Sequence, residues 1–395
     1  MSFIAPFRAL RPAPAVAARV ASVPYDVVSA DEARALAAGE PLSFLHVTRS
    51  EIDLPAGTSP YATEVYARAV ANLRQLQEAA PLLQDREASL YVYRLQMGAH
   101  VQTGVAGVFS VDEYEHDLIK KHEKTRKDKE DDRTRHIVET AAQTGIVFLT
   151  FRQTSAIDAA LARAAAGAPI YDFTAPDGVV HQVWQVAGAA ADPLVRAFRD
   201  VPALYIADGH HRAASAARAR QEFARIGRPT TAAARFLAVA FSDAAVQILP
   251  YNRTVKDLAG QTPEALLAAL DRSGMTAKPG GATPQGPGEA SMFLDGRWYQ
   301  FRLPPADAGS PRDESLDVEV LQRRVLGPIL QVGDPRTDKR IDFVGGIRGT
   351  AELEQRVNSG QAAVAFSLHA VGINDLMAIA DAGGIMPPKS TWFEP

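Results

Sequence analysis

The chain has 395 residues, which is more than one ordinary domain usually holds, so two packed units are expected. Its 42 Lys and Arg residues against 46 Asp and Glu residues give a formal net charge of −4, which argues against a general nucleic-acid binder. The sequence contains no cysteine, which excludes disulfides, thiol catalysis and cysteine-ligated metals.

The first residues contain prolines where a signal peptide needs an apolar run, and no stretch of about 18 uninterrupted apolar residues follows. We therefore expect a cytoplasmic protein without a membrane partner. Ser29 and Glu32 predict a capping box at the start of a helix that ends near Gly39. A long amphipathic helix is predicted at 61–79, and the alternating apolar residues of 89–96 and 101–111 predict a β-hairpin.

Further along the chain, strands are predicted at 145–151, 182–188 and 203–207, and helices at 192–200 and 262–274. The apolar runs 235–243 and 246–255 are predicted to pair as neighbouring strands. The Gly- and Pro-rich segment 278–290 is typical of a linker or an exposed loop.

The C-terminal part begins with a second predicted hairpin at 291–303, which turns at Asp295–Gly296. A helix at 314–330, a strand at 360–371, a helix at 373–384 and a polar tail at 385–395 follow. Strands and helices mix without regular alternation, which predicts the α+β class. We expect a core at 1–256, with a charged insertion at 112–136, and a C-terminal α+β unit at 257–395 that closes the site.

The most informative stretch follows the predicted strand at 203–207, where Asp208, Gly209, His210, His211 and Arg212 lead into an alanine-rich helix. Asp208 is a residue type that favours the N-cap position. The first turn of a helix leaves N–H groups unpaired and carries partial positive charge. Gly209 allows close approach to the backbone, and the two histidines and the arginine add donors. The pattern predicts an anion site, most naturally for phosphate, in which Asp208 is a structural cap or holds a magnesium ion or a hydroxyl group.

The alternative interpretation of this stretch is a capped helix with two surface histidines. A zinc site is disfavoured, because adjacent histidines on a helix point about 100° apart and this stretch supplies no His-x-x-x-His or Glu-x-x-His partner for them.

The strand, the Asp-Gly-His-His-Arg motif and the helix resemble the signature of the ParB/sulfiredoxin fold, and most closely its free serine kinases. The whole chain resembles a bacterial family named domain of unknown function 1015, in the motifs "APFRALRP", "VPYDVV", "KHEKT", "DGHHR", "DPRTDKRI" and "MPPKSTWFEP". The resemblance implies a ParB/sulfiredoxin-like core and a bound nucleotide, ATP or ADP with Mg²⁺. It also implies that the Gly209–Arg212 element cradles the nucleotide phosphates and that free L-serine is the acceptor.

Charge dominates residues 112–136, and opposite charges at helical spacing predict a solvated, salt-bridged helix. The alternative is a phosphoryl-transfer site, which needs cations on the transferred group and a carboxylate to take the hydroxyl proton. On that interpretation the residues that face the nucleotide or the substrate are Lys121, His122, Glu123, Arg126 and Arg133.

Three weaker candidates lie elsewhere in the chain. One is the polar loop with Asp334, Arg336, Lys339 and Arg340, which is either an exposed turn or a phosphate clamp. Tyr25 and Asp26 form either a structural turn or a border of the pocket, and Lys389 either closes over an anion or belongs to a plain tail.

These patterns, taken with the resemblance, predict a small-molecule phosphotransferase that is a nucleotide-dependent kinase. The resemblance implies that its acceptor is a small hydroxyl compound such as free L-serine. The predicted catalytic residues are Asp208, Glu123 and His122. The predicted phosphate-binding residues are Gly209, His210, His211, Arg212, Lys121, Arg126, Arg133 and Lys389. A phosphatase acting on phosphoserine and a nucleotide-binding switch without turnover remain alternatives. The sequence does not predict the oligomeric state.

Overall fold

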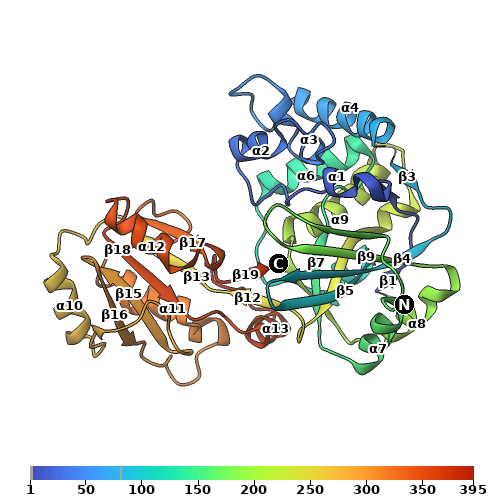
Figure 1. Cartoon of the computed structure of the whole chain (residues 1–395). Coiled ribbons are helices and arrows are strands. Elements are labelled where there is room, and N and C mark those ends of the chain that lie inside the picture. Colours follow the sequence, from blue (N-terminus) through green and yellow to red (C-terminus); the bar gives the residue numbers. More distant parts are fainter. Residues whose placement is uncertain (1–2, 81) are drawn as a thin grey trace. The chain divides into compact units, whose positions relative to one another are not determined.

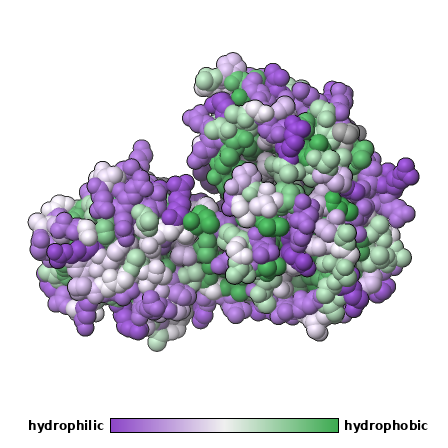
Figure 2. Space-filling view, viewed as in Figure 1, coloured by the Kyte–Doolittle hydropathy of each residue, from purple (hydrophilic) through white to green (hydrophobic). Residues whose placement is uncertain are grey.

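A computed structural model describes residues 3–80 and 82–395 of the chain, and it confirms the α+β class. The chain divides into two compact units, residues 1–245 with Pro395 and residues 246–394 (Figure 1). Hydrophilic residues predominate on the face of each unit drawn in Figure 2, and hydrophobic residues form scattered groups among them. In the part of the chain that the structure describes, each helix is too short or too polar to span a bilayer.

The first unit contains eleven strands and nine α-helices within the described residues. The strands are β1 (Ile4–Ala5), β2 (Leu10–Arg11), β3 (Leu83–Gln84), β4 (Ser89–Met97), β5 (His100–Ser110), β6 (Ile119–Lys120), β7 (Val147–Phe151), β8 (Tyr171–Thr174), β9 (Val180–Ala187), β10 (Leu204–Asp208) and β11 (Arg235–Ser242). The helices are α1 (Ala17–Val20), α2 (Ala30–Ala37), α3 (Leu45–Thr48), α4 (Thr63–Ala79), α5 (Val111–Glu115), α6 (Lys127–Thr140), α7 (Ser155–Ala164), α8 (Asp192–Ala197) and α9 (His210–Arg225).

Most of these strands form one mixed sheet in the order β6-β10-β7-β11-β5-β4-β9-β8, with β1 paired to β5. β6 runs parallel to β10, while β7 runs antiparallel to β10. The residues that follow β6 and β10 therefore lie at the same end of these strands as the residues that precede β7. This end of the sheet brings the charged segment and the Asp-Gly-His-His-Arg motif together.

The alanine-rich run after Arg212 allows α9 to pack closely on the sheet. Ala213, Ala216 and Ala217 of α9 belong to the main core cluster together with Val147 and Phe236, and α9 contacts β7 and β11. Small side chains let a helix backbone approach a sheet closely, so this run seats α9 against the core.

The N-terminal helices form a second layer. The predicted capping box of α2 is confirmed, because the Glu32 N–H donates to Ser29 Oγ and the Ser29 N–H donates to the Glu32 carboxylate. A separate core cluster joins Val47 of α3 to Leu73 and Leu76 of α4. α6 packs against both α4 and α9 (Figure 1).

The charged segment differs from the predicted continuous helix. α6 begins at Lys127, while residues 121–126 form an irregular loop after β6. Lys127 pairs with Asp131 at 2.8 Å within α6, but Arg126 lies before the helix and pairs with Asp128 at 2.8 Å. The segment is integrated in the first unit, because β6 pairs with β10 of the main sheet and α6 packs on α9.

The second unit holds the remaining described elements. They are β12 (Gln247–Leu249), β13 (Tyr251–Val255), α10 (Pro263–Arg272), β14 (Lys278–Pro279), β15 (Glu289–Leu294), β16 (Arg297–Arg302), α11 (Asp317–Leu321), β17 (Ile341–Gly345), α12 (Gly349–Asn358), β18 (Val364–Leu368), α13 (Ile373–Asp381) and β19 (Trp392–Glu394). Six of its strands form a sheet in the order β14-β16-β15-β18-β13-β17, and β12 pairs with β19. The hairpin turning at Asp295–Gly296 is confirmed.

The predicted pairing of 235–243 with 246–255 is wrong. β11 pairs with β5 and β7, whereas β12 pairs with β19 and β13 pairs with β17 and β18. The division between the units consequently falls after Ala245, upstream of the predicted division after Lys256. The Gly- and Pro-rich segment lies inside the second unit, where it carries β14 and leads into β15, so it does not link the units.

Candidate functional site

The centre of the candidate site is the junction between β10 and α9. β10 ends at Asp208, Gly209 adopts the left-handed conformation with φ of +92°, and α9 begins at His210. A Cβ atom at Gly209 would lie 3.3 Å from Arg212 Nη1 and 3.4 Å from the Cα of Val147. The left-handed backbone conformation is the feature that favours glycine here, since both contacts are close to ordinary packing distance.

The prediction that Asp208 caps α9 is wrong. Gly209 occupies the N-cap position, and the Asp208 carboxylate instead accepts a hydrogen bond from Arg212 Nη2 at 2.7 Å. Because Gly209 is the N-cap residue, Asp208 is the last residue of β10. Its carboxylate contacts Arg212, which lies in the first turn of α9.

The loop 121–126 crosses the beginning of α9. The backbone N–H of His122 donates to His210 Nε2 at 3.3 Å, and the backbone N–H of Arg126 donates to His211 Nε2 at 2.9 Å. Because Arg126 is the N-cap residue of α6, the second of these bonds joins the start of α6 to the start of α9.

Both of these helix starts lack a side-chain cap. α6 has 14 residues and α9 has 16, and neither N-cap side chain accepts a hydrogen bond from the first turn. Acidic residues occur in the first turn of α6, at Asp128 and Glu130, but none occurs in that of α9. The end of the sheet therefore presents two regions of partial positive charge, one of them without an acidic side chain of its own.

Glu123 lies beside this junction. Its Oε2 atom is 3.6 Å from His210 Nδ1, and its side chain remains 58% exposed. His210 is only 4% exposed and packs edge to face on His122, with ring centroids 4.4 Å apart. Glu123 thus combines a position at the start of α9 with access to solvent, as a group that exchanges protons with a bound substrate must.

His122 is a buried and neutral ring. It is 3% exposed, its Nδ1 atom has no hydrogen-bond partner within the described residues, and burial lowers its pKa to about 4. The pKa of His210 is also lowered, first by burial and then by the neighbouring His122. His122 was predicted as a catalytic group, but its ring is buried against His210 and has little access to solvent.

Four of the predicted phosphate-binding cations, Lys121, Arg126, Arg133 and Arg212, pair with carboxylates, and burial divides these four into two groups. Arg126 pairs with Asp128 and is 71% exposed, and Lys121 pairs with Asp117 at 3.2 Å and is 34% exposed. Arg133 pairs with Asp132 at 2.7 Å and is 13% exposed. Exposed ion pairs contribute about 0–1 kcal/mol to stability, whereas breaking a buried pair costs about 3–5 kcal/mol. An incoming anion can therefore displace the carboxylates that pair with Arg126 and Lys121, but not the one that pairs with Arg133.

Arg212 belongs to the buried group, with 9% of its side chain exposed. Its Nη2 atom donates to Asp26 at 2.8 Å and to Asp208 at 2.7 Å, and its Nη1 atom donates to the carbonyl of Ile146. These partners bring the turn at Asp26 and the start of β7 against the β10–α9 junction. Their charges hold the pKa of Arg212 above its usual value, against the opposing effect of burial.

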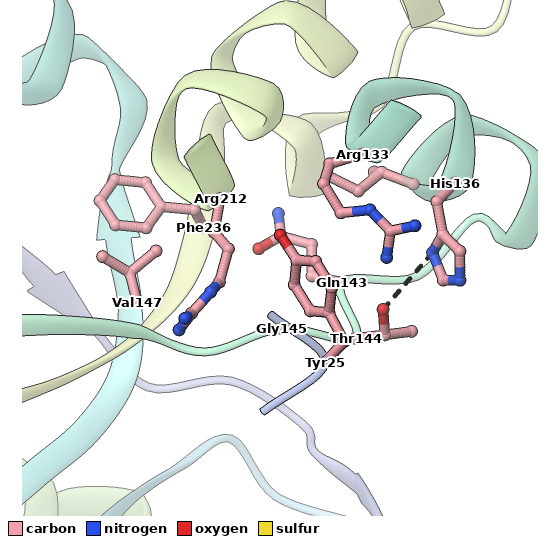
Figure 3. A pocket seen from close by; sticks show the side chains of 10 residues that line it. Tyr25, Arg133, His136, Gln143, Thr144, Gly145, Val147, Arg212 and Phe236 are labelled. Atoms are coloured by element: carbon pink, nitrogen blue, oxygen red, sulfur yellow. Dashed lines mark hydrogen bonds between the residues drawn. The ribbon is translucent and has the colours of Figure 1, made fainter. Parts of the chain in front are cut away.

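A small cavity lies behind Arg212 (Figure 3), where the guanidinium groups of Arg133 and Arg212 approach the Tyr25 ring at 4.4 and 5.9 Å from its centroid. His136 and Thr144 also line it and are joined by a 3.4 Å hydrogen bond. Its volume is about 20 Å³, which accommodates about one water molecule. Ligand pockets measure hundreds of cubic ångströms, so this cavity is not a preformed nucleotide pocket.

The sequence interpretation left several residues of this region out of the site. His136, Thr144, Gly145 and the Ile146 carbonyl were not candidates, because the segment before β7 carries no unusual residue pattern. Asp26 was a weak candidate, and its bond to Arg212 spans 186 positions of sequence.

Two predicted roles stay predictions. Lys389 belongs to the second unit, where its Nζ atom lies 5.5 Å from the centroid of the Tyr251 ring, and its part in closing the site stays a prediction. As for metal, the residues that the structure describes contain no group of three or more His, Cys, Asp or Glu side chains able to hold an ion. Asp208 alone remains the predicted magnesium ligand.

The model of the family described as "Protein of unknown function (DUF1015)" matches residues 4–321 of the chain. The chain belongs to this family. No curated protein matches the DUF1015 chain.

Solved structures similar to this DUF1015 protein include three that cover 73% of it. The free serine kinase in complex with AMP is 12% identical, with 87% of its own chain covered and a TM-score of 0.34. A conserved hypothetical protein from Pyrococcus furiosus is 14% identical, with 90% covered and a TM-score of 0.33. SbnI with a C-terminal truncation, from Staphylococcus aureus, is 12% identical, with 82% covered and a TM-score of 0.37.

Proposed function

We propose that this protein is a nucleotide-dependent phosphotransferase that acts on a small hydroxyl compound such as free L-serine. The observation that carries the proposal is the meeting of two helix N-termini, both without side-chain caps, beside the accessible carboxylate of Glu123. Phosphoryl transfer requires positioning, positive electrostatic potential at the phosphates and a group that accepts the hydroxyl proton. These requirements match what this end of the sheet offers.

Phosphate oxygens are suited to the first turn of α9, which has free capping positions and no acidic residue. Arg126 is the side-chain cation best able to join them, since its pair with Asp128 is exposed and weak. Arg212 and Arg133 are held by buried partners, so we assign them to the framework of the site and not to the phosphate. This assignment departs from their predicted phosphate-binding role, and the reason is their burial.

Glu123 is the proposed general base. The acceptor's hydroxyl proton would pass to Glu123 as the acceptor oxygen bonds to the terminal phosphorus and the bond to the departing nucleotide breaks. A base must lie within hydrogen-bond reach of that proton, and Glu123 is the exposed carboxylate whose oxygen lies 3.6 Å from the first residue of α9.

Mg²⁺ fits the chemistry of Asp208, whose side chain is 59% exposed at the end of β10. Magnesium in phosphoryl-transfer sites is usually bound by one or two carboxylates together with phosphates and water, so a larger cluster of protein ligands is not needed. When bound, the ion would neutralise charge on the transferred phosphoryl group.

The experiment is phosphorus NMR of the full chain with Mg²⁺, ATP or ADP, and L-serine. We expect a phosphoserine signal to grow as the terminal nucleotide phosphate is lost. Release of inorganic phosphate from phosphoserine alone would replace the proposal by a phosphatase. A nucleotide that raises the melting temperature by mass action, without any transfer, would replace it by a binding switch.

A further inference from the structure

The paired histidines of the Asp-Gly-His-His-Arg motif both accept hydrogen bonds from the backbone of one loop. His210 Nε2 accepts from the N–H of His122, and His211 Nε2 accepts from the N–H of Arg126. We infer that His210 and His211 are positioning residues that fasten the loop 121–126 across the start of α9 and thereby hold Glu123 in place. The hydrogen bonds that fasten the loop do not depend on the proposed function. Only the role of the loop in placing Glu123 as a base rests on it.

These two bonds determine the protonation of each ring. An imidazole nitrogen accepts a hydrogen bond only through its lone pair, and a protonated ring has none. His210 and His211 must therefore be neutral, with the proton on Nδ1 and the lone pair on Nε2. For His210 the Nδ1–H then faces Glu123 Oε2 at 3.6 Å.

The surroundings of both rings favour this neutral state. Burial is the largest cause of the lowered pKa of each ring. The charged and titratable groups that act on His210 are Glu123, His122, His211, Arg212 and Lys121, and those that act on His211 are Glu130, Asp26, Arg126 and Lys129. The cations on both lists oppose protonation.

This assignment gives His210 a role other than the predicted phosphate contact. Its ring is 4% exposed, one nitrogen accepts from the loop and the other faces Glu123. A neutral ring with both nitrogens engaged adds no positive charge for a phosphate. It can orient the carboxylate of Glu123 while the rest of that side chain remains open to solvent.

Glutamine and asparagine substitutions test the roles of the two ring nitrogens separately. Glutamine places an amide oxygen near the position of Nε2 and can still accept from the loop, whereas asparagine places its amide near Nδ1 and cannot. His211→Gln should keep the bond to the Arg126 N–H, and His211→Asn should lose it. His210→Gln should keep the bond to the His122 N–H but lose the donor that faces Glu123. His116→Gln is the matched control, because His116 is an exposed histidine at the end of α5.

The first measurement is nitrogen-15 NMR of the imidazole rings in the parent protein, which needs neither a substrate nor a variant. We expect His210 and His211 to show an Nδ1–H tautomer at pH 7. An Nε2–H tautomer or a charged ring at pH 7 would overturn the inference.

The second measurement is amide hydrogen exchange at Arg126. We expect about tenfold faster exchange in His211→Asn, with the parent rate retained within about twofold in His211→Gln and in His116→Gln. Equal rates in His211→Asn and the parent, or equal acceleration in His211→Asn and His211→Gln, would contradict a ring-nitrogen acceptor.

Where transfer is measured, the positioning role predicts that His210→Gln lowers kcat about tenfold or more and leaves the KM for the nucleotide within about twofold. If the NMR results are as expected but kcat is unchanged in His210→Gln, then His210 fastens the loop and does not position Glu123. An absence of transfer in the parent would overturn the proposed function instead, so the two failures are distinct.

Discussion

Replacing Glu123 with glutamine should lower the rate of phosphoryl transfer by about 10²–10⁴ while the protein stays folded. The substitution keeps the shape of the side chain and removes its ability to take a proton. Because the carboxylate is 58% exposed and lies at 3.6 Å from a neutral ring, its loss should change the free energy of unfolding by less than about 0.5 kcal/mol. The measurements are kcat by phosphorus NMR and a denaturant titration.

Glu139→Gln provides the control for Glu123→Gln. Glu139 is an exposed carboxylate on α6 that pairs with Arg135 at 3.7 Å, away from the start of the helix. Its replacement should leave both turnover and stability at the parent values. Equal turnover in Glu123→Gln and Glu139→Gln would show that the carboxylate beside His210 is not the base.

Replacing Arg212 with methionine should destabilise the first unit by about 3 kcal/mol, the low end of the range for a broken buried ion pair. The guanidinium holds Asp26, Asp208 and the Ile146 carbonyl together, and methionine satisfies none of them. The two carboxylates are partly exposed, so water replaces part of the lost interaction and keeps the cost near that lower limit. Arg212→Lys retains the charge without the planar fork and should cost about 1–2 kcal/mol.

Arg225→Met is the matched control on the same helix. Arg225 lies in the last turn of α9 and forms an exposed pair with Glu222, so its loss should cost less than about 1 kcal/mol. Denaturant titration of the three variants, with amide exchange at residues 25–27 as a local probe, measures the difference. Stability and exchange equal to the parent in Arg212→Met would contradict the view that this arginine anchors the turn at Asp26.

The strand–glycine–helix junction could be predicted from the sequence because each signal in it is local. An apolar run predicts a buried strand, and the spacing of Ala216, Ala219 and Phe223 predicts a helix that starts near His210, where α9 begins. The cap could not be predicted in the same way. Asp208 and Gly209 are both favoured N-cap types, and only the left-handed backbone of Gly209 decides between them.

The partners of the site residues were harder to predict, since they come from distant parts of the chain. Charge spacing in 112–136 predicted pairs within one helix, but the helix begins at Lys127 and the residues before it bond to the start of α9. The role of Arg212 depends on its bond to Asp26, and the local sequence around either residue does not predict that bond. Strand pairing failed for the same reason at 235–255, because an apolar run predicts a strand without naming its neighbour.

The central claim is that nucleotide phosphates bind where α6 and α9 begin, and amide hydrogen exchange with and without Mg²⁺ and ATP tests it most directly. Because the N–H groups of a helix's first turn are the proposed phosphate donors, nucleotide should slow exchange at residues 209–212 and 126–128. The same titration on Arg126→Gln should require a higher nucleotide concentration to reach that protection. Protection confined to the cavity around Tyr25, to residues 246–394, or absent at saturating nucleotide would contradict the claim.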